Sequence, residues 1–89
     1  MTKSISIQIT GRVQGVGFRY HARYRAEEFG IKGFARNEED GSVYIEAAGE
    51  ESKLDQFVDW CRSGPRLARV DTFCTKPLEL RDYPGFSVK

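Results

Sequence analysis

The sequence predicts an α+β fold in which two helices cover one face of an antiparallel sheet. Short segments with alternating apolar and polar residues have the pattern of strands with one buried face. Two other segments carry apolar residues at three- and four-residue intervals, which is the spacing of amphipathic helices. The segments follow one another in the order β-α-β-β-α-β, and a further short strand pattern ends the chain.

Length and composition indicate one small domain without bulk charge. We expect the 89 residues to form a single domain, residues 1–89, because a chain of this size encloses one hydrophobic core. The formal net charge is +1, which does not predict binding to nucleic acid. No apolar run approaches the ~20 residues that span a bilayer, and no signal-peptide pattern begins the chain. We therefore expect a cytoplasmic monomer that binds neither nucleic acid nor membrane.

The first strand and the first helix are predicted from the N-terminal third. Three isoleucines alternate with polar residues from Lys3 to Thr10, which favours a strand. Apolar residues at helical spacing then predict a helix from Phe18 to Phe29. Gly30 supplies the left-handed residue that commonly follows a helix.

A hairpin and a second helix follow. Residues 31–37 and 42–48 are strand-like, and Asp40-Gly41 between them suits a tight reversal, so we expect an antiparallel pair. Glu50-Glu51-Ser52 then places acidic charge and a possible cap at the start of a helix. The buried stripe of this helix is predicted at Leu54, Phe57, Val58 and Cys61.

The last third contains two strand patterns, and the sequence leaves the register of the first one open. Strict alternation from Ala68 to Thr75 puts Val70, Thr72 and Cys74 on one face. A bulge near Thr72 would instead turn Val70 and Phe73 inward together. A polar connection, residues 77–84, then leads to a short final strand at residues 85–88.

The order of elements predicts the topology. Two right-handed β-α-β units fold most simply into a four-stranded antiparallel sheet with both helices on one face. This is the ferredoxin-like βαββαβ arrangement. Because that fold carries many unrelated functions, function has to be inferred from particular residues.

A glycine-punctuated loop joins the first strand to the first helix, with the sequence Gly11-Arg12-Val13-Gln14-Gly15-Val16-Gly17-Phe18-Arg19. Glycines permit the positive φ angles that turn backbone N–H groups inward, and such a nest at a helix N-terminus attracts phosphate or carboxylate. The alternative is a connection that only allows the helix to pack closely on the sheet. Arg19 favours the anion site, because a cation in the first helical turn is otherwise unfavourable by about 0.3–1 kcal/mol.

Asn37 ends the second strand, immediately before the hairpin turn. Asparagine is common in turns, so a purely structural role is one interpretation. In the predicted topology, however, the first and second strands end on the same side of the sheet, and we expect Asn37 to lie near the loop. Its uncharged amide can hold a water molecule without repelling an anion.

Two motifs resemble the signatures of the acylphosphatase family. One is the loop from Gly11 to Arg19, and the other is Gly33-Phe34-Ala35-Arg36-Asn37 followed by Gly41-Ser42-Val43 and Gly49. The similarity extends over nearly the whole chain, including residues 26–33, Gly64-Pro65 and Gly85-Phe86, and only residues 76–83 look individual.

This resemblance implies an enzyme that hydrolyses the carboxyl-phosphate bond of small acyl phosphates without a metal or another cofactor. It implies that Arg19 binds the phosphoryl group and that Asn37 positions the attacking water. The backbone N–H groups of the loop would hold the phosphate oxygens, and the residues concerned are Gln14, Gly15, Val16, Gly17, Phe18 and Arg19. Phosphoryl transfer depends mainly on alignment and charge stabilisation, which a nest and a guanidinium supply.

Other interpretations remain beside this one. The alternative function is a non-catalytic ferredoxin-like module that binds an acyl phosphate or another anion, as the similar domain of hydrogenase-maturation carbamoyltransferases suggests. RNA binding is disfavoured because the first strand carries small polar side chains where stacking needs aromatic ones. Cys61 and Cys74 are expected to be reduced core thiols, His21 is expected to face solvent, and the three do not form a metal-ligand set.

Overall fold

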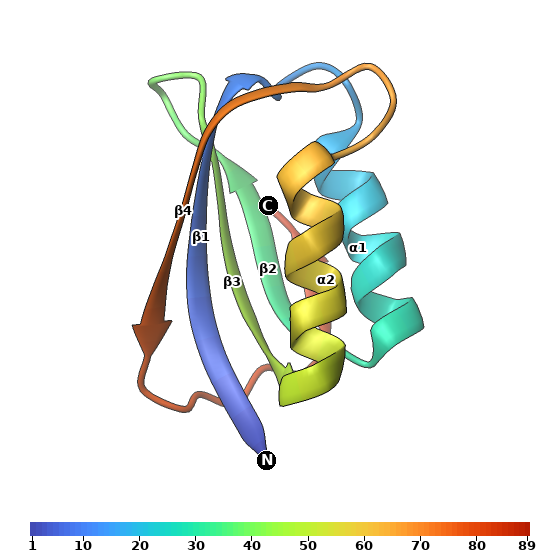
Figure 1. The fold of residues 1–89 in the computed structure, drawn as a ribbon, viewed down its shortest axis with the longest axis vertical. Coiled ribbons are helices and arrows are strands. Elements are labelled where there is room, and N and C mark those ends of the chain that lie inside the picture. Colours follow the sequence, from blue (N-terminus) through green and yellow to red (C-terminus); the bar gives the residue numbers. More distant parts are fainter.

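Five strands and two helices form two layers, with both helices on one face of the sheet (Figure 1). The computed structural model describes residues 1–89. The predicted α+β, ferredoxin-like fold is confirmed. The strands are β1 (Thr2–Arg12), β2 (Lys32–Asn37), β3 (Val43–Glu50), β4 (Arg69–Leu78) and β5 (Phe86–Val88), and the helices are α1 (Phe18–Phe29) and α2 (Glu51–Ser63).

The sheet has the strand order β4-β1-β3-β2-β5 and is mixed. Four strands pair antiparallel, as the sequence predicts. β5 adds a fifth strand and runs parallel to β2, so the sheet is not wholly antiparallel. The reason is the segment after β4, which crosses from one edge of the sheet to the other before β5 begins (Figure 1).

The C-terminal ends of β1 and β2 lie at the same end of the sheet. Both strands pair antiparallel with β3 and flank it, so they run parallel to each other. The loop after β1 and the β2–β3 turn therefore lie at one end of the molecule, the upper end in Figure 1. This topology explains how residues about twenty positions apart in the chain come close together.

The core lies between the sheet and the helices. The predicted limits of α1 are confirmed, and Gly30 ends the helix with a φ of 69°. The predicted stripe of α2 is also confirmed: Leu54, Phe57 and Cys61 are buried, and Val58 packs partly buried against them. Neither helix combines the length and the apolar character that crossing a membrane requires.

The structure decides or corrects three local expectations, which concern β4, Cys74 and the start of α2. β4 has a register shift, because Thr10 pairs with Thr72 and Gly11 with Val70, so the bulge is the alternative that holds. Val70 and Phe73 accordingly pack against the core, whereas Cys74 is exposed and is not a core thiol. The cap of α2 is Glu50, whose side chain accepts hydrogen bonds from the backbone N–H groups of Ser52 and Lys53.

The helix-free face of the sheet carries a buried carboxylate, Glu46, which is 8% exposed. It accepts hydrogen bonds from the hydroxyls of Tyr44 (2.7 Å) and Tyr83 (2.5 Å) and from Nη1 of Arg81 (3.0 Å). We call these four residues the Glu46 cluster. Arg81 and Tyr83 belong to the segment between β4 and β5, so the cluster fastens that segment to β3.

Candidate active site

A pocket of about 150 Å³ lies where β1 and β2 end. The structure brings Arg19 and Asn37 together there, although they come from α1 and β2. Gln14 and Val16 do not line this pocket. The lining residues are Val13, Gly15, Gly17, Phe18, Arg19, Tyr20 and Asn37.

The backbone N–H groups of residues 14–19 donate no hydrogen bond to another part of the protein backbone. The first backbone bond of α1 runs from the N–H of His21 to the carbonyl oxygen of Gly17, at 3.0 Å. No side chain caps this helix, and its first turn contains no acidic residue. The positive end of the helix dipole therefore coincides with a row of free donors, which is the arrangement that binds an anion.

The backbone favours glycine at two positions of this loop. Gly15 has a φ of 74° and Gly17 a φ of 78°, both in the left-handed region that other residues rarely adopt. Gly17 is also the N-terminal cap of α1. These two angles turn the chain from the end of β1 into the helix.

Arg19 is half-buried, and its charge is not neutralised by any acidic side chain. Its Nη1 donates to a main-chain oxygen of Lys89, the last residue of the sequence, at 2.5 Å. Its Cζ lies 5.7 Å from the centre of the Tyr20 ring, within the range of a cation–π interaction. The Arg19 side chain thus lines the pocket, where a planar guanidinium can bind two oxygens of an anion at once.

Asn37 is the last residue of β2 and pairs with Val43 of β3. It is exposed, and its position in the strand ladder fixes where its side chain leaves the backbone. The neighbouring basic residue, Arg36, differs from Arg19 because it is paired with Glu38 at 3.2 Å. Of the two arginines, only Arg19 lines the pocket.

The side chain of Gln14 was not anticipated. Its Nε2 donates to the carbonyl oxygens of Glu38 (2.8 Å) and Ser42 (2.9 Å), in the β2–β3 turn. In the sequence, only the position of a glutamine among glycines indicates a role for this side chain. The sequence does not show which groups accept its hydrogen bonds. The side chain therefore joins the loop to the turn, while the backbone of the residue belongs to the row of free donors.

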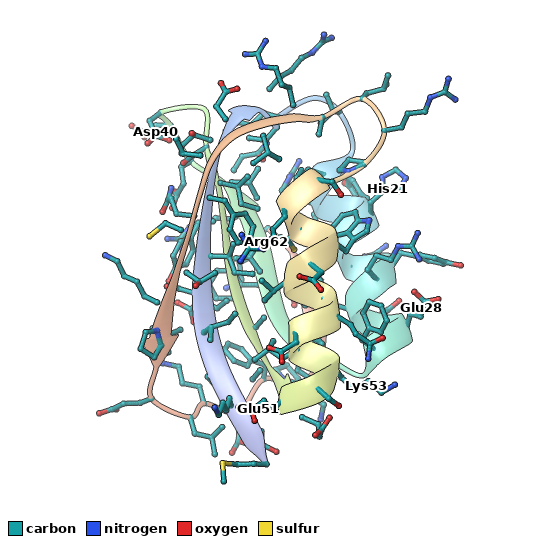
Figure 2. The ribbon with its side chains drawn as sticks, in the orientation of Figure 1. His21, Glu28, Asp40, Glu51, Lys53 and Arg62 are labelled. Carbon is teal, nitrogen blue, oxygen red and sulfur yellow. The ribbon has the colours of Figure 1, made fainter.

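Two other polar residues lie at this end of the molecule. His21 is exposed, as predicted, on the outer side of α1 (Figure 2), and its Nδ1 is 2.9 Å from the carbonyl oxygen of Gly17. Asp40 lies at the tip of the turn (Figure 2), where hydrogen bonds from the hydroxyl and N–H of Ser42 lower the pKa of its carboxyl. No group of three His, Cys, Asp or Glu residues is arranged to hold a metal ion.

The fold and the site define the class of this protein. It is a ferredoxin-like α+β protein. The N-terminus of α1 has free backbone amides and lies beside Arg19, an arrangement that is suited to an anion. A profile of the acylphosphatase family matches residues 5–88. The chain therefore belongs to the acylphosphatase family.

Individual relatives agree with this assignment. The chain is 48% identical over 85 residues to an acylphosphatase from Archaeoglobus fulgidus, with 96% of each chain covered. It superimposes on the structure of an acylphosphatase from Coxiella burnetii with a TM-score of 0.95 and 32% identity, covering 99% of this chain and 93% of that one. It also matches full-length HypF in its phosphate- and nucleotide-bound form with a TM-score of 0.89 and 28% identity, but covers only 12% of that longer chain.

Proposed function

We propose that the protein is an acylphosphatase, which hydrolyses the carboxyl-phosphate bond of a small acyl phosphate to a carboxylate and inorganic phosphate. Family membership supports this proposal, as do relatives of the same name that the chain matches along nearly its full length. The observation that carries the proposed mechanism is the row of free backbone N–H groups at residues 14–19, beside Arg19.

The phosphoryl group binds in the pocket between this loop and Asn37. The N–H groups of residues 14–19 hold its non-bridging oxygens, and the planar guanidinium of Arg19 meets two oxygens at once. Charge on these oxygens is stabilised by donors that are already oriented, so the transition state needs little reorganisation. This electrostatic role is the one that a metal ion fills in many other phosphoryl-transfer sites.

Asn37 holds the attacking water on the opposite side of the phosphorus from the leaving group. Its neutral amide both accepts and donates hydrogen bonds, so it orients a water without repelling the phosphate. The leaving group is a carboxylate, a weak base, and leaves without a proton from a general acid. The mechanism therefore requires neither a titrating side chain nor a metal, and a reaction of this kind is mainly one of alignment.

The decisive experiment is hydrolysis of benzoyl phosphate and acetyl phosphate by the purified protein in excess EDTA. We expect turnover well above the background rate, and a rate equal to background would refute the proposal. Arg19→Ala should lower kcat/KM by about 10²–10³-fold, the usual loss when one oriented donor is removed. Arg36→Ala is the matched control, because the charge of Arg36 is already paired with Glu38, and it should keep turnover near that of the parent.

Asn37→Ala separates binding from chemistry. We expect this variant to bind inorganic phosphate as the parent does but to lose most of its turnover. Phosphate binding is measured as competitive inhibition, or by titration where turnover is too low. If Asn37→Ala hydrolyses the substrate like the parent, the role of Asn37 in holding water is wrong.

The alternative is a non-catalytic module that binds an acyl phosphate or another anion. Its support is the likeness to HypF, of which this chain spans 12%. Phosphate binding without turnover in the EDTA assay would favour this alternative. We further propose a cytoplasmic monomer that acts as one domain, which size-exclusion chromatography with light scattering and cell fractionation would test.

A further inference from the structure

Two hydrogen bonds join the loop of the proposed site, residues 14–19 (the phosphate-binding loop), to the turn that follows Asn37. Both are donated by Nε2 of Gln14, to the carbonyl oxygens of Glu38 at 2.8 Å and Ser42 at 2.9 Å. The pairing of β1 with β3 ends at Ile9 and Val43, before the loop begins. No other hydrogen bond connects residues 13–17 with residues 37–42.

The acceptors require an amide nitrogen at this position. Both neighbours of Nε2 are carbonyl oxygens, which accept and cannot donate, so the nitrogen rather than the oxygen of the Gln14 amide faces them. Each of the two hydrogens on that nitrogen serves one carbonyl. An isosteric glutamate would place acceptors against acceptors, and an apolar side chain would donate nothing.

The turn does not depend on Gln14 for its own closure. The carbonyl oxygen of Glu38 also accepts from the N–H of Gly41 at 3.1 Å, and that of Ser42 accepts from the N–H of Glu38 at 2.8 Å. Removing the Gln14 amide therefore leaves neither carbonyl without a partner, so the expected loss of stability is small. What the two bonds add is the link across to the loop.

The link lies one residue away from each half of the site. Gln14 precedes Gly15, which lines the pocket, and Glu38 follows Asn37. We infer that Gln14 is a positioning residue, whose side-chain amide holds Asn37 in register with the phosphate-binding loop. The inference rests on the proposed function, because the register matters where a water held by Asn37 must attack a phosphoryl group held by the loop.

Gln14→Met tests this inference against Gln8→Met. Methionine is close to glutamine in shape and lacks the donors. Gln8 is the matched control, because its Nε2 donates to Oγ of Ser42 at 2.6 Å and so reaches the same turn, but from β1 and not from the loop. Gln14→Met should lower kcat by about 10-fold or more, since a misplacement of about 1 Å can cost about 10²-fold in rate.

The same variants distinguish positioning from a merely structural role. In Gln14→Met the KM and the inhibition constant of inorganic phosphate should stay within about two-fold of the parent, because the loop and Arg19 still bind the anion. Gln8→Met should keep kcat within about two-fold. Equal losses of kcat in the two variants, or a loss in Gln14→Met that appears only in KM, would overturn the inference.

An Asn37→Ala background gives a second test. If Gln14 acts through Asn37, Gln14→Met lowers kcat in the parent but not in Asn37→Ala, where its effect should be below about two-fold. If the loss of kcat in the double variant equals the product of the losses in Gln14→Met and Asn37→Ala, Gln14 acts independently of Asn37 and the inference is wrong.

Backbone order parameters of residues 13–17, measured by NMR, do not depend on activity. They should fall in Gln14→Met, from the range near 0.85 of rigid backbone, and stay unchanged in Gln8→Met. Unchanged order parameters in Gln14→Met would refute the link itself. An inactive parent protein would refute the proposed function and leave this measurement to decide on the link.

Discussion

Replacing Gly64 with Ala is expected to destabilise the protein more than the same change at Gly30. Both glycines end a helix, and each has a φ of 69°. A Cβ at Gly30 meets nothing within 4 Å. A Cβ at Gly64 lies 3.2 Å from Cζ and 3.0 Å from Cδ2 of Phe18, and closer still to Cε2. The Phe18 ring has little room to retreat, because the residue is 1% exposed and its ring centre lies 5.5 Å from that of Trp60.

The magnitude follows from the backbone and the contact. Gly30 has a ψ of 28°, the left-handed helical region, where an alanine costs about 1–2 kcal/mol. Gly64 has a ψ of −166°, in a region that almost only glycine adopts, with a cost of about 1–3 kcal/mol. Overlap with Phe18 adds about 1–3 kcal/mol. The total for Gly64→Ala is about 2–6 kcal/mol, which lowers Tm by at least about 8 °C in a domain of this size.

Urea unfolding followed by the fluorescence of Trp60, the only tryptophan, measures both variants. The reasoning is refuted if Gly64→Ala loses no more free energy of unfolding than Gly30→Ala. A double-mutant cycle isolates the contact: in a Phe18→Leu background the smaller side chain makes room, so Gly64→Ala should cost less than in the parent. An equal cost in both backgrounds would locate the effect in the backbone alone.

Three further predictions concern titrating side chains. Burial alone would raise the pKa of Glu46, but hydrogen bonds from the two tyrosines of its cluster and its pairing with Arg81 outweigh burial and lower the pKa. The contribution of Glu46 to stability is therefore present above pH ~4.5 and is lost as the pH falls through the pKa of the folded state. Glu46→Gln should accordingly reduce the difference in urea midpoint between pH 7 and pH 3, and an unchanged difference would contradict this. Burial and the hydrogen bond to Glu46 raise the pKa of Tyr83 to about 12, so this side chain contributes stability that is full below pH ~10 and is lost as the pH rises through about 12. The absorbance step of tyrosinate at the highest pH should be missing in Tyr83→Phe. Burial raises the pKa of the Cys61 thiol, so a thiol reagent should modify only the exposed Cys74 in the native protein. Cys74→Ser should abolish that reaction, and Cys61 should react only after unfolding.

Local signals in the sequence were sufficient for much of the fold. The limits of α1 follow from apolar spacing and from Gly30, and both determinants lie within the helix or next to it. The nearness of Asn37 to the loop was predictable from topology, since strands that flank a common antiparallel partner must end on the same side. The loop itself is recognisable because the left-handed angles found at Gly15 and Gly17 are adopted mainly by glycine.

Features that depend on distant partners could not be predicted. Glu46 lies in an alternating strand and looks solvated, but its partners Arg81 and Tyr83 are 35 and 37 residues away in a polar connection. The exposure of Cys74 depends on a bulge opposite Gly11, which strict alternation does not reveal. The acceptors of Gln14 are backbone carbonyls, which no residue type encodes.

The pairing of β1 with β4 has a consequence for how the chain folds. β1 lies inside the sheet, and Ser4 pairs with Leu78, at the far end of the sequence. Loop-closure entropy opposes such a non-local pairing until the intervening chain has collapsed, so folding should be slow for a protein of this length. On the ribosome, the first strand to emerge would have one edge unpaired until residues 69–78 have been made, and association through that edge is the misfolding route to expect.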